Sequence, residues 1–186
     1  FQAEDGIRDC LLSRGLGDVY KRQDLEALAI GLHEGIDEEY LKYRIEQVRY
    51  LGEELSKRGI PIILPTGGHG VYVDAQKFYP HIPQNEFPGQ ALVVELYKTA
   101  GVRGVELGSC AFSKKDKETG AIIYPDLELV RLTVSRRVYT HRHMDVVIKA
   151  LEDVYKRRSQ MKGLKLTYEG PIISLRHFTA KFKQIT

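Results

Sequence analysis

The sequence predicts an α/β or α+β chain with a small, partly antiparallel sheet. Segments with an apolar period of 3.6 residues alternate with short apolar runs that are bounded by glycine and proline. The chain has 186 residues, of which 42% are hydrophobic and 28% charged, as in an ordinary soluble protein. A chain of this length forms one domain, or one domain with appendages, and can bury a substantial core.

The composition excludes several classes of protein. The net charge is +3 and both signs are mixed along the chain, so no charged tail for nucleic acid or membrane is expected. Cys10 and Cys110 are too few for a disulfide framework or a metal cluster. No apolar run approaches the roughly 20 residues of a membrane span, and no signal peptide is recognisable. We therefore expect a cytoplasmic protein without nucleic-acid or membrane partners.

Residues 1–23 differ from the rest of the chain. They show no sustained period, they contain three glycines, and they resemble a translated sequencing-adapter tail. The alternative is a genuine flexible N-terminus. We expect 1–23 to lie outside the fold and 24–186 to form one domain.

Capping and turn residues set the expected elements. Asp24 and Asp37 are suitable N-caps, Gly59 suits the left-handed position after a helix, and Pro88 suits a first helical turn. Helices are predicted over 24–35, 37–58, 88–99 and 143–160. Strands are predicted over 60–64, 71–73, 102–107, 127–134 and 164–168. Residues 113–120 form a solvated turn between strands, and the segment after 168 is predicted to be an irregular arm.

Arg131 is the residue most indicative of a binding site. It lies in the strand 127–134, in which residues 128, 130, 132 and 134 share one face and residues 129, 131 and 133 share the other. A guanidinium in such a strand needs a partner, because an unpaired buried charge costs about 3–5 kcal/mol. The partner is either a substrate carboxylate, held by two parallel hydrogen bonds, or a carboxylate of the chain itself. The pattern alone favours the internal ion pair.

Histidines and glycines give weaker signals. The stretch 66–70, which contains His69, joins two strands and reads as a tight turn rather than a phosphate loop. His141 and His143 precede a helix and could cap it, but no third ligand suggests a zinc site. His177 taken alone is an exposed or capping histidine. No nucleophile elbow, zinc-protease helix or Cys-x-x-Cys motif is present, so no catalytic set is complete.

Three longer stretches resemble the tryptophanase and tyrosine phenol-lyase family, the aromatic β-eliminating lyases. They are HIPQNEFPGQALVVELYKTAGVRGVELGS at 81–109, LVRLTVSRRVYTHRHMDVV at 129–147 and LRHFTAKF at 175–182. Shorter matches at 24–32, 49–55 and 67–75 extend the resemblance, in order, over essentially everything after residue 23. An ordered resemblance of this extent is more specific than any single motif.

The resemblance implies the C-terminal part of an aspartate-aminotransferase-type fold, fold type I. It further implies a lyase that uses pyridoxal 5'-phosphate as electron sink and a potassium ion as activator, acts on a small aromatic amino acid, and assembles as a homotetramer. The lysine that forms the Schiff base and the residues that bind the cofactor belong to the family's upstream region. We therefore assign no catalytic or cofactor-binding residue in 1–186, and expect the chain alone to be inactive.

Substrate-binding positions follow from the same resemblance. Arg131 matches the family arginine that binds the substrate α-carboxylate, which reverses the preference for an internal ion pair. Leu107 stands where the tyrosine-cleaving branch has an arginine, and His177-Phe178 stands where that branch has two phenylalanines. Both differences favour tryptophan, cleaved to indole, pyruvate and ammonium, whereas Arg136-Arg137 looks more like the tyrosine-cleaving branch.

A binding module of a different class is the remaining alternative. Residues 162–170 and 176–183 mix lysines with aromatic side chains, as RNA-binding segments do. Charge of this density more often covers a solvated surface.

Overall fold

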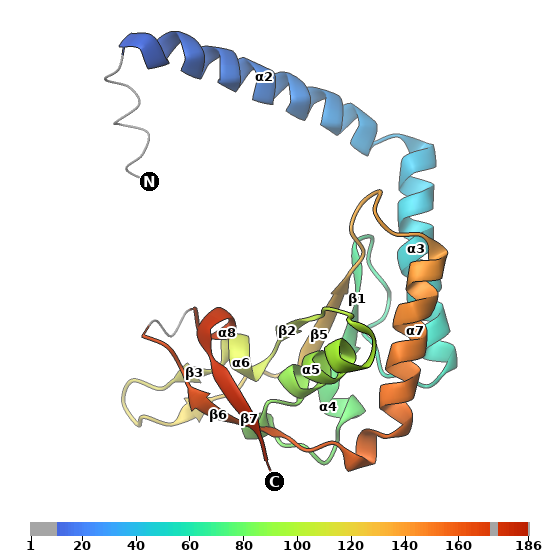
Figure 1. Cartoon of the computed structure of the whole chain (residues 1–186), viewed down its shortest axis with the longest axis vertical. Coiled ribbons are helices and arrows are strands. Elements are labelled where there is room, and N and C mark those ends of the chain that lie inside the picture. Colours follow the sequence, from blue (N-terminus) through green and yellow to red (C-terminus); the bar gives the residue numbers. More distant parts are fainter. Residues whose placement is uncertain (1–10, 172–174, 186) are drawn as a thin grey trace. The chain divides into compact units, whose positions relative to one another are not determined.

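The computed structural model describes residues 11–171 and 175–185, with side chains from residue 22 on. Contacts divide the chain into two units, 1–43 and 44–186. Helix α2 (Leu11–Gly35) belongs to the first unit, and helix α3 (Glu38–Lys57) begins in the first unit and ends in the second (Figure 1). No helix in the described part of the chain combines the length and the apolar character that a membrane crossing requires.

The start of the first helix was predicted wrongly. Asp24 lies inside α2 rather than at its N-cap, because the helix already begins at Leu11. Residues 18–23 contain good helix formers such as Lys, Arg and Gln, and these continue the helix across the predicted boundary. Side chains 22–34 are all exposed, so local propensity rather than packing holds this helix. Residues 1–10 of the predicted tail lie outside the described residues, and the origin of 1–23 stays a prediction.

Helix α3 confirms the predicted cap and stop. The Asp37 carboxylate accepts a hydrogen bond from the Tyr40 amide at 2.8 Å, and Gly59 has the left-handed φ of 70°. Only the C-terminal half of the predicted apolar stripe is buried, at Val48, Leu51 and Leu55.

A three-stranded antiparallel sheet forms the centre of the second unit. The strand order is β1 (Gly70–Asp74), β5 (Leu129–Thr133) and β2 (Val105–Leu107), with β5 in the middle (Figure 1). Strand β2 is shorter than the predicted 102–107. The prediction of a strand over 60–64 was wrong. This segment forms only a single β-bridge, between Ile62 and Val73. The short helix α4 (Ala75–Phe78) follows β1 directly.

One face of the sheet is covered by helices and holds the core. Helix α5 (Pro88–Ala100) contacts β2, β5 and the long helix α7 (His141–Lys156). The predicted alternation in β5 is confirmed, since residues 128, 130, 132 and 134 are buried in this core whereas 129 and 131 are half-buried and 133 is exposed. The long helix predicted to reach residue 160 ends at Lys156, and the 3-10 turn η2 (Arg158–Gln160) follows it.

The C-terminal arm is more regular than predicted. Strand β6 (Leu164–Tyr168) pairs with β7 (Lys181–Gln184), and the one-turn helix α8 (Arg176–Thr179) lies between them. Phe182 packs edge-on against Phe87, with ring centroids 5.2 Å apart, and this contact fixes the hairpin beside the start of α5. The sequence showed no period here because each element is only four or five residues long.

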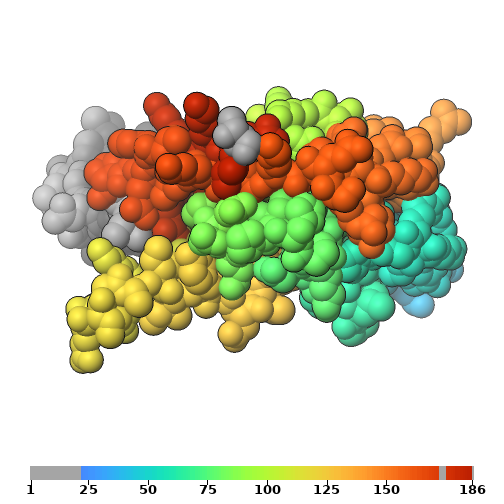
Figure 2. All heavy atoms as spheres, turned by 90° about the horizontal axis from the view of Figure 1, so that it is seen from below, coloured from blue at the N-terminus to red at the C-terminus, as the bar shows by residue number. Residues whose placement is uncertain are grey.

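Four small elements complete the second unit. Helix α6 (Ser109–Phe112) follows β2, and the 3-10 turn η1 (Gln84–Glu86) precedes α5. Strands β3 (Lys114–Lys115) and β4 (Ile122–Ile123) flank the solvated turn, as predicted for 113–120. This hairpin projects from the surface as the yellow lobe in Figure 2.

Candidate functional site

Arg131 lies in the centre of the sheet, on the face opposite the helix-covered core. Its cross-strand neighbours are Tyr72 in β1 and Val105 in β2, whose side chains lie on the same face. The side chain is half-buried, and its Nε atom is fully buried with no hydrogen-bond partner. Within the described residues no carboxylate forms an ion pair with this guanidinium. The internal ion pair that the pattern alone favoured is therefore not found in this part of the chain.

Tyr72 connects Arg131 to His69. The Tyr72 hydroxyl lies 3.1 Å from His69 Nε2, and the two rings meet edge to face. His69 is itself exposed, at the turn that precedes β1. The Tyr72 side chain is thus the cross-strand neighbour of the arginine and at its hydroxyl end contacts the imidazole of His69.

His177 and Phe178 lie beside the edge strand β2, where they line a hollow of about 740 Å³. Val105 and residues of α5 line the same hollow. The two rings are tilted by 44° with their centroids 3.8 Å apart, and Phe178 is 78% exposed. Val105 therefore joins the two parts of the candidate site, because it borders this hollow and is the cross-strand neighbour of Arg131.

The structure brings together some of the predicted substrate-binding residues and not others. His177 and Phe178 share one hollow, whereas Arg131 and Leu107 do not line it. Leu107 is half-buried, lies two residues along β2 from Val105 on the same face, and pairs with Leu129. A substrate that reached all four residues would have to cover the open face of β2 and β5.

Two buried carboxyl groups lie directly behind this face, and the sequence analysis missed their role. Glu106 is 5% exposed and Glu128 is 1% exposed. Burial raises the pKa of the Glu106 carboxyl to about 7, and the nearby Glu128 acts in the same direction. Burial also raises the pKa of Glu128, against the opposing effect of the hydrogen bonds from Ser109. The signal available in the sequence was an acidic residue at each core-facing position next to Leu107 and Leu129.

Arg176 is a second functional residue that the sequence analysis missed. Its guanidinium is almost completely buried and donates to the backbone carbonyls of Ser109 and Cys110, at 2.9 and 2.8 Å. It also donates to the Ser113 hydroxyl at 2.5 Å and pairs with Glu169 at 3.0 Å. Arg176 thus fixes α8, which carries His177 and Phe178, to the α6 turn that follows Leu107.

Comparison with known proteins identifies the family. Residues 26–150 match the sequence model of a family described as beta-eliminating lyase. The chain belongs to this family. The β-eliminating lyases use pyridoxal phosphate and have fold type I, and the mixed helices and strands around the β1-β5-β2 sheet agree with that fold.

Relatives of this lyase chain carry two different names. It is 51% identical over 164 residues to a tyrosine phenol-lyase of Symbiobacterium sp. (strain SC-1). The matched residues make up 88% of this chain and 35% of the relative. It is 48% identical over 161 residues to a tryptophanase of Salinibacter ruber, which covers 87% of the chain and 33% of the relative. A probable tryptophanase of Aeropyrum pernix is 47% identical over 164 residues, with 88% and 35% covered. The lyase chain thus spans about a third of the length of these curated relatives.

No lysine among the described residues of the chain lies in a buried site. A Schiff base to pyridoxal phosphate requires a lysine amine held against the cofactor ring. All lysine side chains between residues 22 and 171 and between 175 and 185 are exposed. These residues can bind and orient a substrate, and no chemical step through the cofactor is derived from them.

Two further features of the chain lie outside the candidate site. The Thr140 amide donates to His143 Nδ1 at 3.1 Å, so His143 caps α7, one of the two roles that its position suggested. No group of three metal-ligating side chains occurs among the residues that the structure describes.

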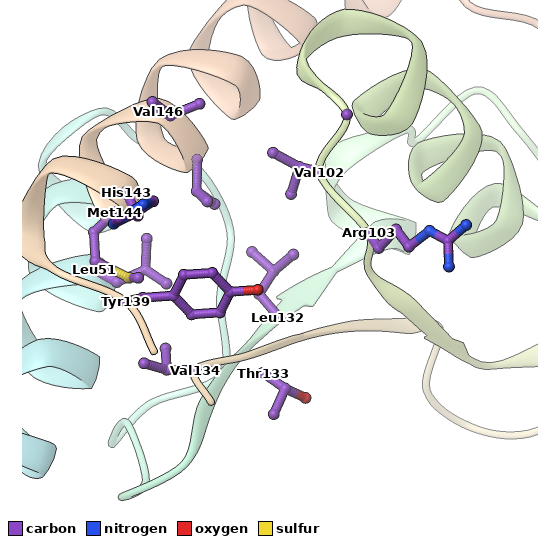
Figure 3. A pocket seen from close by; sticks show the side chains of 12 residues that line it. Leu51, Val102, Arg103, Leu132, Thr133, Val134, Tyr139, His143, Met144 and Val146 are labelled. Atoms are coloured by element: carbon purple, nitrogen blue, oxygen red, sulfur yellow. The ribbon is translucent and has the colours of Figure 1, made fainter. Parts of the chain in front are cut away.

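A second hollow, of about 320 Å³, lies between α7 and β5, and the Tyr139 ring points into it (Figure 3). It contains none of the four predicted substrate-binding residues.

Proposed function

We propose that this chain is the C-terminal third of a tryptophanase, which cleaves L-tryptophan to indole, pyruvate and ammonium. The observation that carries the proposal is the guanidinium of Arg131, which lies without a carboxylate partner on the open face of the sheet. Pyridoxal phosphate and the potassium ion would be bound mainly by the remaining two thirds of the protein. We further propose that the complete protein is a cytoplasmic homotetramer.

Arg131 would bind the substrate α-carboxylate by two parallel hydrogen bonds. Its cross-strand neighbours Tyr72 and Val105 lie on either side of it, on the same face of the sheet. A carboxylate fixed in this way also fixes the Cα–H bond of the amino acid relative to the cofactor. The role of Arg131 is orientation rather than proton transfer, because a guanidinium remains protonated at all physiological pH values.

Leu107 and His177 support tryptophan as the substrate. Leu107 offers an apolar wall, which suits the indole ring better than a phenol whose hydroxyl needs a polar partner. His177 and Phe178 form an aromatic pair at the hollow beside β2, where an indole ring could stack and its N–H could reach an imidazole.

Tyrosine is the second candidate substrate. The chain is 51% identical to the tyrosine phenol-lyase of Symbiobacterium and 48% identical to the tryptophanase of Salinibacter, so overall identity does not favour tryptophan. Arg136 and Arg137 also resemble the tyrosine-cleaving branch. The side chains that face the substrate decide between the two, because a missing hydrogen-bond donor discriminates more strongly than the rest of the surface.

The proposal is tested by adding the missing region. A protein in which residues 24–186 complete the upstream two thirds of a related tryptophanase should release indole and pyruvate from tryptophan with a higher kcat/KM than phenol from tyrosine. The 186-residue chain alone should release neither. Faster turnover of tyrosine would refute the assignment to tryptophan, and activity of the chain alone would refute the assignment of the catalytic lysine to the missing region.

Leu107→Arg should shift this preference toward tyrosine. A guanidinium at this position supplies a donor for the phenol hydroxyl and is left unpaired beside an indole, which costs about 1–3 kcal/mol. We expect kcat/KM for tryptophan to fall about 10- to 100-fold relative to that for tyrosine. The measurement is the ratio of the two kcat/KM values, with Leu107→Met as the matched control that preserves the apolar wall. An equal fall for both substrates would show that Leu107 acts on the fold and not on specificity.

A further inference from the structure

The carboxyl groups of Glu106 and Glu128 converge on the backbone of Gly108. A methyl group placed on Gly108 would collide with Oε2 of Glu128 and would lie 2.9 Å from Oε1 of Glu106. Both oxygens therefore border the same small space, which only glycine leaves free. The residue between Glu106 and Gly108 is Leu107, so the two carboxyl groups lie directly behind the proposed specificity position.

The hydrogen bonds of the two carboxyl groups differ. Each oxygen of Glu106 accepts a backbone N–H, Oε1 from Cys110 and Oε2 from Ala111, both at 3.0 Å. Glu128 uses only Oε1, which accepts from the Ser109 amide at 2.8 Å, the Ser109 hydroxyl and the Gln84 amide. Oε2 of Glu128 is buried without a hydrogen-bond partner. Glu106 therefore has the surroundings of a carboxylate, whereas Glu128 has one oxygen suited to carry a proton.

We propose that Glu106 and Glu128 share one proton, which resides on Oε2 of Glu128 and is donated to Oε1 of Glu106, and that this pair positions the β2–α6 corner on which Leu107 stands. In this form Oε2 gains a hydrogen-bond partner and the buried site carries one negative charge instead of two. Two adjacent buried carboxylates would repel each other in a region of low dielectric. The pair is a positioning device, and it does not depend on which amino acid the complete protein cleaves.

The other groups around the pair do not supply a counter-charge in direct contact. Arg176 of α8 donates to the carbonyls of the α6 turn and pairs with Glu169, and it makes no hydrogen bond to either carboxyl group. Burial raises the pKa of the Cys110 thiol to about 12, so this group stays neutral. Asp74 of β1 is the cross-strand partner of Leu129, the residue after Glu128, and forms an ion pair with Lys77 at 2.9 Å. From α5 the Gly89 amide faces Glu128 and acts to lower the pKa of its carboxyl group, although Oε2 has no hydrogen-bond partner.

The shared proton predicts that stability falls as pH rises. Burial raises the pKa values of both carboxyl groups above the ordinary 4.5, that of Glu106 to about 7, and because the two groups interact, this titration belongs to the pair and not to one residue. Between these two pH values the folded chain holds a proton that the unfolded chain has released. The stabilisation is therefore complete below pH 4.5 and is lost as pH rises through about 7. Ordinary surface carboxylates, with lowered pKa values, give the opposite slope.

Glu128→Gln is the decisive variant, measured by urea unfolding of the 186-residue chain at about pH 5 and about pH 8. The glutamine amide can replace the protonated oxygen as donor to Glu106 while its carbonyl still accepts from Ser109. We expect the unfolding equilibrium constant of the unmodified chain to rise about 10- to 100-fold more between the two pH values than that of Glu128→Gln. Glu118→Gln, at an exposed carboxylate of the β3–β4 hairpin, is the matched control and should keep the original dependence.

Two further measurements separate this inference from a purely structural role. Glu106→Gln should destabilise the chain at both pH values, because the glutamine NH2 group replaces one of the two accepting oxygens and cannot accept from the amide of Cys110 or Ala111. The infrared C=O band of a protonated carboxyl group should be present at neutral pH in the unmodified chain and absent in Glu128→Gln. A pH dependence that survives in Glu128→Gln, or a missing infrared band in the unmodified chain, would overturn the shared proton.

Discussion

Replacing Arg131 with alanine in the complete lyase is expected to lower kcat/KM for the amino acid about 100- to 1000-fold, mainly through KM. A bidentate pair between a guanidinium and a carboxylate in a partly buried site contributes about 3–4 kcal/mol, which corresponds to this factor. The Nε atom of Arg131 is already removed from water without a protein partner, so the substrate carboxylate does not have to strip water from it. Absorbance of the bound cofactor should stay unchanged, because under the proposed function the residues that hold the cofactor lie outside this chain.

The matched controls are Arg131→Lys and Arg142→Ala. Lysine keeps the charge but offers a single point donor, and we expect it to recover only part of the loss. Arg142 is exposed at the start of α7, and its replacement should leave the kinetics unaltered. If Arg131→Ala had the same KM as the unmodified enzyme, the arginine would have no role in binding the carboxylate and the proposed function would lose its main support.

The sequence predicted the middle strand of the sheet and several helix ends well, because the signals for these features are local. The alternation in β5, the cap at Asp37, the glycine at position 59 and the proline at position 88 each act within a few residues, and the structure has all of them. The predictions failed where an element depends on a distant partner or lacks one. Residues 60–64 are apolar but pair with β1 through one bridge only, and β7 forms because β6 offers a free edge.

The candidate site was predictable only in part. Arg131 was recognisable because a charge within an apolar strand is unusual. Glu106 and Glu128 carry the same signal, since each stands between apolar residues, but their convergence on Gly108 is a property of the tertiary fold. Arg176 precedes His177 in a segment without a clear period, so nothing local showed that its guanidinium is buried.

Arg176→Leu is expected to destabilise the second unit by about 3–5 kcal/mol, since it leaves buried hydrogen-bond acceptors without a donor. At the α6 turn the Cys110 carbonyl accepts from this guanidinium, and the Ser109 carbonyl accepts from it and, at 3.3 Å, from the Ser113 amide. Leucine fills most of the volume, so the loss arises from the unsatisfied polar groups rather than from a cavity. The measurement is the urea midpoint, with Lys183→Leu on the exposed face of β7 as control.

The same substitution should also affect substrate binding before the fold is lost. Arg176 is the first residue of α8, and His177 and Phe178 follow it directly. Its guanidinium also binds the α6 turn, which begins two residues after Leu107. Releasing both turns moves the two walls of the proposed aromatic site relative to each other, whereas Arg131 stays in place in the middle of the sheet. In the complete enzyme at low denaturant, KM for tryptophan should therefore rise more than KM for a small amino acid that relies on Arg131 alone. Equal increases would mean that Arg176 supports the fold in general and not the aromatic site.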